Sequence, residues 1–120
     1  MTQVHWQELN LLEMLDILRS GGLACVALRG ADAPYALPMH YQLEMRGMQP
    51  VLHMAWSAQG RKAEALRDES HLCVLVLRRL CAWTDSVLAE GVAQAEPAEG
   101  GLHVTLPVTA LSGRRMFLQP

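Results

Sequence analysis

Short apolar runs separated by turn residues constrain the fold of this chain more than any other feature. Residues 23–28 (Leu-Ala-Cys-Val-Ala-Leu) and 72–77 (Leu-Cys-Val-Leu-Val-Leu) have the length of strands, and we expect both to be buried on both faces. Residues 102–108 alternate apolar with more polar side chains, which predicts a strand with one buried face. None of these runs approaches the roughly 20 apolar residues that a membrane-spanning helix needs. The chain is therefore expected to consist mainly of short strands.

Glycine and proline residues delimit the remaining strands. Residues 35–44 and 51–56 are predicted strands, and the first of them should form a hairpin with residues 23–28. Pro38 lacks an N–H group, so that point should be a sheet edge or a bulge. Residues 83–94 are predicted as a longer strand, and residues 95–101, which contain a proline and two glycines, as a loop.

Two helices are expected. Asn10 and Glu13 have the spacing of a capping box, leucines then recur at helical spacing, and Gly21 and Gly22 end the segment. A second helix is predicted from Arg61 to about residue 68. Six strands and two helices in so short a chain should curl into a small barrel.

Composition limits the classes of function. The 120 residues correspond to one domain, 51% of them are hydrophobic, and the net charge of −2 argues against nucleic acid as a partner. Cys25 and Cys73 lie in apolar runs and are expected to be buried and reduced, which leaves Cys81 as the candidate for reactivity. Since no signal peptide is visible, we expect a cytoplasmic protein without a membrane partner.

Lys62 is the only lysine in the sequence. It follows Arg61 at the start of the second predicted helix, where the helix dipole favours negative charge. Two cations and the backbone N–H groups of a helix start form a site suited to a phosphate. The alternative interpretation is that both residues are solvated surface charges.

The histidines and tryptophans permit more than one interpretation. His40 and His53 lie on predicted strands that could pair, either as partly buried hydrogen-bonded residues or at the edge of a ligand. Trp56 and Trp83 could belong to the core or could form the wall of a site for a flat ligand. No spacing typical of a metal site or of a catalytic triad is present, so we expect no metal.

Three motifs in order resemble a known family. They are Pro34-Tyr35-Ala36-Leu37-Pro38, the turn Gly60-Arg61-Lys62, and Ser86-Val87 with Gly91 four residues later. The region from about Asp16 to Gln94 is similar to the pyridoxamine 5′-phosphate oxidase-like FMN-binding split barrels, in the branch of the nitroimidazole-resistance proteins. The resemblance implies a six-stranded split β-barrel that forms a homodimer, with FMN in a cleft at the subunit interface.

The resemblance also implies roles for particular residues. Arg61 and Lys62 would hold the FMN phosphate, with a hydroxyl from Ser57. Along the isoalloxazine ring would lie Pro38, Met39, His40 and Tyr41. Beside the ribityl chain would lie Met54, Ala55 and Trp56. The residues near Trp83 to Ser86 would border the cleft or come from the partner subunit. Many relatives carry a histidine where this chain has Ala55, and here His53 lies two residues earlier.

A flavin-dependent oxidoreductase that acts on a small organic molecule is the function implied by the resemblance. Because the cofactor carries the electrons, such chemistry needs no catalytic triad and no metal. Two alternatives remain: a flavin binder or sensor without catalysis, and a haem-binding split barrel in which His40, His53 or His103 would be the axial ligand. The substrate and the electron donor are not identified by the sequence.

Overall fold

The computed structural model describes residues 3–29, 32–57, 66 and 71–119. These residues form ten strands and one helix. In chain order they are β1 (Gln3–Glu8), α1 (Leu11–Ser20), β2 (Leu23–Arg29), β3 (Pro34–His40), β4 (Gln42–Arg46), β5 (Gln49–Trp56), β6 (His71–Arg79), β7 (Trp83–Val92), β8 (Gln94–Ala98), β9 (Gly101–Pro107) and β10 (Ala110–Gln119).

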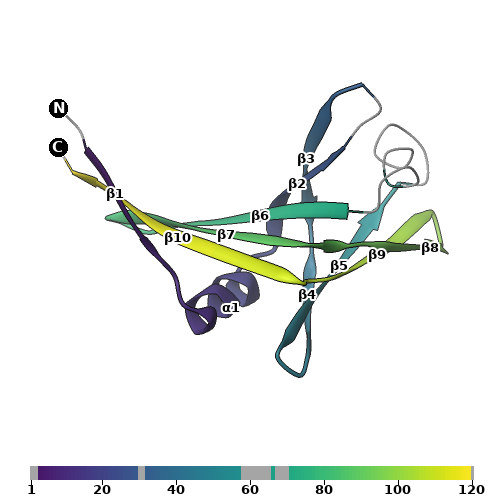
Figure 1. Cartoon of the computed structure of the whole chain (residues 1–120). Helices are drawn as coiled ribbons and strands as arrows, with labels where there is room; N and C mark the ends of the chain where they lie inside the picture. Colours follow the sequence, from purple (N-terminus) through teal and green to yellow (C-terminus); the bar gives the residue numbers. More distant parts are fainter. Residues whose placement is uncertain (1–2, 30–31, 58–65, 67–70, 120) are drawn as a thin grey trace.

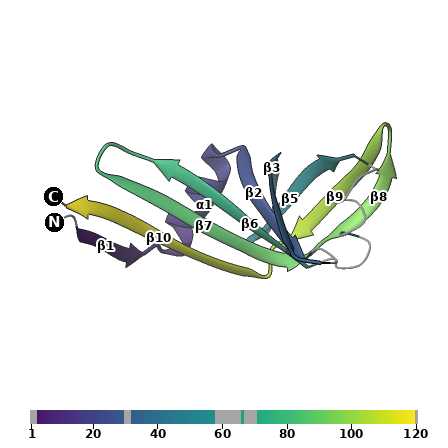
Figure 2. The same ribbon diagram turned by 90° about the horizontal axis from the view of Figure 1, so that it is seen from above.

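The strands form two antiparallel sheets (Figure 1). One sheet has six strands in the order β1-β10-β7-β6-β2-β3, and the other has four in the order β4-β5-β9-β8. The two chain ends lie together, where β1 pairs with β10 (Figure 2). The described part of the fold is mainly β. Because neither sheet closes on itself, the strands form two open sheets in place of one closed barrel.

The prediction of six strands is wrong for two reasons: two predicted strands each divide between the two sheets, and β1 and β10 were not predicted as strands. Residues 35–44 divide at Tyr41 into β3 and β4, and residues 83–94 divide at Ala93 into β7 and β8. The predicted loop at 95–101 is also wrong, since most of it is β8. Pro97 is tolerated there because β8 is the edge strand of its sheet. The hairpin of β2 with β3 is confirmed, as is the edge position of Pro38 in β3.

Helix α1 begins and ends where the sequence predicts. The amide of Glu13 donates to Oδ1 of Asn10 over 2.8 Å, and the amide of Asn10 donates to Oε1 of Glu13 over 3.0 Å. These two bonds satisfy amides that a helix start leaves unpaired. The second predicted helix lies outside the described residues except Leu66, which is helical and buried. In the part of the chain that the structure describes, no helix is long and apolar enough to cross a membrane.

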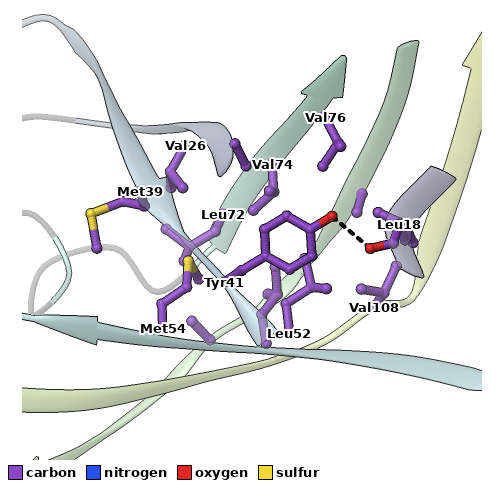
Figure 3. Packing of buried hydrophobic residues seen from close by; sticks show 14 of the residues in the cluster. Leu18, Val26, Met39, Tyr41, Leu52, Met54, Leu72, Val74, Val76 and Val108 are labelled. Atoms are coloured by element: carbon purple, nitrogen blue, oxygen red, sulfur yellow. Dashed lines mark hydrogen bonds between the residues drawn. The ribbon is translucent and has the colours of Figure 1, made fainter. Parts of the chain in front are cut away.

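Tyr41, at the crossing from β3 to β4, lies in the hydrophobic core. Its ring packs among buried aliphatic side chains that include Leu52, Leu72 and Val74 (Figure 3). The hydroxyl donates a 2.7 Å hydrogen bond to the carbonyl oxygen of Leu18, in the last turn of α1. A single residue therefore links the helix to the segment that joins the two sheets.

The prediction that β2 and β6 are buried on both faces is wrong. Their burial alternates, because the core covers only one face of the six-stranded sheet. Cys25 is exposed and Cys73 is half-buried, which contradicts their predicted burial. We call the opposite, mainly apolar face the outer face; it carries Leu23, Cys25, Ala27, Leu75, Leu77 and Leu88.

Asp85 is the one charged residue that is fully buried among the described residues. Its carboxylate accepts a 2.8 Å bond from Nε of Arg115 and a 3.3 Å bond from Nη2 of Arg78. Burial raises the pKa of Asp85, but the hydrogen bonds and charges of the two arginines outweigh burial, and the net pKa is lowered.

Candidate ligand-binding cleft

A cleft of about 770 Å³ opens where the chain crosses between the sheets. This volume is in the range of about 300–1,000 Å³ that is usual for small-molecule sites. Its walls come from the crossing after β3, the second half of β5 and the hairpin of β8 and β9; the lining residues are His40, Tyr41, Gln42, His53, Met54, Ala55, Trp56, Ser57, Ala98, Glu99, Gly100, Gly101, Leu102 and His103.

Six of the twelve residues assigned to the cofactor line this one cleft: His40, Tyr41, Met54, Ala55, Trp56 and Ser57. Their contact with a cofactor stays a prediction. Arg61 and Lys62 lie outside the described residues. Ser57, which lines the cleft, is the last described residue before the segment that contains them.

The other assigned residues lie away from the cleft. Pro38 is exposed on the edge strand β3, and Met39 is buried in the core. Trp83 lies at the end of β7 that is distant from β8, where the guanidinium of Arg115 is 4.7 Å from its ring centroid. Ser86, also in β7, is half-buried and pairs in register with Leu77 on the outer face.

Two glycines shape the hairpin wall of the cleft. Gly100 has a φ of 78°, a left-handed conformation that favours glycine in the turn between β8 and β9. A Cβ atom at Gly101 would clash with the carbonyl oxygen of Trp56. Because this position lacks a side chain, β9 packs closely against the end of β5, and Trp56 remains 2% exposed beneath the cleft.

A polar cluster lies at the cleft and was not predicted as a unit. His53 places Nε2 2.7 Å from Oε1 of Glu44 and Nδ1 3.0 Å from Nε2 of His103. His53 therefore bonds to β4 and β9. The predicted pairing of the strands at 35–44 and 51–56 is found for β4 and β5, with Gln42 opposite His53. The partners are 9 and 50 residues away in sequence. The alternation of residues 102–108 predicted a strand but could not identify its neighbour.

The carboxylate of Glu44 is held in its charged form. Hydrogen bonds from His53 and from Arg46 lower the pKa of Glu44, and the arginine lies 3.1 Å away. No group of three or more His, Cys, Asp or Glu side chains arranged for a metal ion is found among the described residues. The polar groups of the cleft thus include imidazoles, an amide, a hydroxyl, the carboxylate of Glu99 and backbone groups, and the buried ring of Trp56 lies beneath them.

Among the described residues, two open antiparallel sheets, a short capped helix and a cleft where the sheets cross correspond to the fold class of the split barrels. No family model matches the sequence, and no curated protein matches it. Solved structures do match, at low identity and over nearly the whole chain.

The structure of a FAD-binding protein from Mesorhizobium loti is 18% identical, with a TM-score of 0.79, and the match covers 92% of this chain and 97% of that one. A candidate 5-nitroimidazole antibiotic resistance protein from Bacteroides thetaiotaomicron is 13% identical, with a TM-score of 0.85 and 98% and 92% covered. A candidate pyridoxamine 5′-phosphate oxidase from Corynebacterium glutamicum is 16% identical, with a TM-score of 0.76 and 96% of both chains covered. The chain has the fold of these proteins.

Proposed function

We propose that this chain is a flavin-binding protein that holds FMN in the cleft and acts as an oxidoreductase on a small organic molecule. The observation that carries the proposal is the position of His40, Tyr41, Met54, Ala55, Trp56 and Ser57 around one cleft. These residues were assigned to the cofactor from sequence resemblance alone, and they come from two strands that are not hydrogen-bonded to each other.

The chemistry of the cleft fits a flavin. The buried side chains of Met54 and Trp56 give the cleft an apolar base that suits a planar ring, and the imidazoles and the amide of Gln42 suit its polar edge. The chain then continues from Ser57 towards Arg61 and Lys62, which would hold the phosphate. Two of the matching structures are described as FAD-binding proteins, so FAD is the competing cofactor. A bound flavin supplies the electron-transfer chemistry, and these residues bind and orient it.

A homodimer is part of the proposal. The outer face leaves apolar side chains uncovered, and Leu23 and Leu77 are 58% and 59% exposed. A second copy of the chain would cover this face, and its residues would help to enclose the cleft. Contiguous apolar surface of this kind is typical of an interface.

The absorption spectrum of the purified protein, alone and with added FMN, tests the proposal. Flavin bands that shift or lose fluorescence on addition of protein are the expected result. A Soret band in place of flavin bands would support the haem-binding alternative. Consumption of NADH or NADPH with and without a nitroaromatic acceptor then separates an oxidoreductase from a flavin binder without catalysis.

A further inference from the structure

Glu44, His53 and His103 form a continuous hydrogen-bonded chain across three strands. In register, His103 lies opposite Ala55 of β5, and Glu44 lies opposite Val51 of the same strand. Residues 51, 53 and 55 share one face of β5, so the three polar side chains are diagonal neighbours on that face. His53 and His103 line the cleft, whereas Glu44 is exposed and is not among the lining residues. The chain thus leads from the cleft to a carboxylate.

The charge of Glu44 determines which ring nitrogens carry protons. A carboxylate only accepts, so Nε2 of His53 must donate to it. When His53 is neutral, its Nδ1 accepts a hydrogen bond from the Nε2–H group of His103, and Nδ1 of His103 keeps a lone pair. Among the described residues, no hydrogen-bond partner for Nδ1 of His103 is present. That nitrogen is available to a ligand as an acceptor.

One added proton reverses the direction of the second bond. A protonated His53 donates both to Glu44 and to Nε2 of His103, which then carries its proton on Nδ1. The nitrogen at the cleft end changes from an acceptor to a donor, while the positive charge stays on His53, next to the carboxylate. The three side chains therefore keep the added charge on His53, beside the carboxylate, and present a proton on Nδ1 of His103.

We propose that Glu44, His53 and His103 form a proton-transfer chain, and that a ligand in the cleft exchanges a proton with Nδ1 of His103. The inference rests on the proposed function, and the ligand class is a molecule with a nitrogen or oxygen that gains a proton, such as FMN or its organic substrate. In the transfer, the Nδ1–H bond of His103 breaks and a bond forms between that proton and the lone pair of the ligand atom. Nε2 of His103 takes the proton from Nδ1 of His53, and both imidazoles end neutral.

Other ionisable groups surround the proton-transfer chain of Glu44, His53 and His103. Arg46 bonds to the carboxylate of Glu44 and keeps it charged. Glu96 of β8 lies opposite His103 in register, and His40 and Glu99 line the cleft. Of these, Glu96 is a suitable control, because it is exposed, near His103, and makes no bond to the chain in the described structure.

The first test needs no flavin. In protein with ¹⁵N-labelled histidine, a coupling between Nδ1 of His53 and Nε2 of His103 across their hydrogen bond is the expected result. The coupling should disappear in His103→Gln and persist in Glu96→Gln. Absence of the coupling in the wild type would overturn the proposed proton-transfer chain, whichever ligand the cleft binds.

The second test uses FMN as the probe. Titration calorimetry of FMN into protein, in buffers of different ionisation enthalpy, measures the protons taken up on binding. We expect net uptake by the wild type, a reduction of about twofold or more in Glu44→Gln and His103→Gln, and no change in Glu96→Gln. Equal uptake by four proteins that all bind FMN would overturn this inference alone. A wild type that binds no FMN would contradict the proposed function and, with it, the role assigned to the ligand.

Discussion

At the residue scale, Lys62 tests whether the segment after the cleft holds a phosphate. Lys62→Ala should weaken the binding of FMN by roughly ten- to a hundredfold, because a charge-assisted hydrogen bond contributes about 1.5–3 kcal/mol. Lys62→Glu should weaken it further. Fluorescence titration with riboflavin, which has no phosphate, is the control and should be nearly unaffected. Equal losses for FMN and riboflavin would mean that Lys62 does not act on the phosphate.

Asp85 governs a different property, the dependence of stability on pH. Because its pKa is lowered in the folded protein, the unfolded chain takes up this proton first as the pH falls. The stabilisation is therefore present above the ordinary value of 3.8 and is lost as the pH falls below it.

Asp85→Asn should lower the free energy of unfolding at pH 7 by about 3 kcal/mol, since it leaves two arginines without their buried partner. Urea unfolding at pH 7 and pH 3 measures this. The difference in free energy of unfolding between the variant and the wild type should be smaller at pH 3 than at pH 7. A gap that stays constant would show that the carboxylate does not carry the stabilisation.

At the scale of elements, Tyr41 ties helix α1 to the crossing between the sheets. Tyr41→Phe keeps the packing of the ring but leaves the carbonyl of Leu18 without this donor. We expect a loss of about 1–2 kcal/mol in the free energy of unfolding. Urea unfolding of the variant and of the wild type measures this loss. A free energy of unfolding equal to that of the wild type would remove the special role of this bond.

Some helices and strands could be predicted from the sequence, and others could not. The cap of α1 and the hairpin of β2 and β3 depend on residues close in sequence, and both were predicted. The division at Tyr41 was not, because a strand that changes sheets shows no break in its apolar pattern. Strand β8 looked like a loop because Pro97 and the nearby glycines are turn residues, yet an edge strand accepts proline.

Contact of the candidate site residues with a cofactor stays a prediction. Six of the assigned residues, from the end of β3 to the end of β5, line one cleft, whereas the assigned Pro38 and Met39 lie away from it. His103 and Glu44 reach His53 through strand pairing over 50 and 9 residues, which no local pattern specifies. The burial predicted for Cys25 was wrong for a related reason, since an apolar strand with one exposed face has the same sequence pattern as a strand buried on both faces.

At the scale of the whole molecule, the outer face predicts association. Leu77→Arg should convert a dimer to a monomer, because it places a charge in an interface expected to bury on the order of 1,600 Å² or more. Leu12→Arg, on a leucine of α1 that is also exposed, should leave the dimer intact. Light scattering at micromolar concentration gives the mass. A stable wild-type monomer with ligand bound would contradict the dimer and the shared cleft.

The most direct test of the central claim is to block the cleft and measure flavin binding. Ala55 is exposed and lines the cleft, so Ala55→Trp should fill the site without disturbing the core. Ala95→Trp places the same side chain on exposed β8, outside the cleft. With FMN fluorescence as the readout, we predict that the wild type and Ala95→Trp bind one FMN per chain and that Ala55→Trp loses at least about tenfold in affinity, or about 1.4 kcal/mol. Equal binding by all three proteins, or no binding by the wild type, would contradict a flavin site in this cleft.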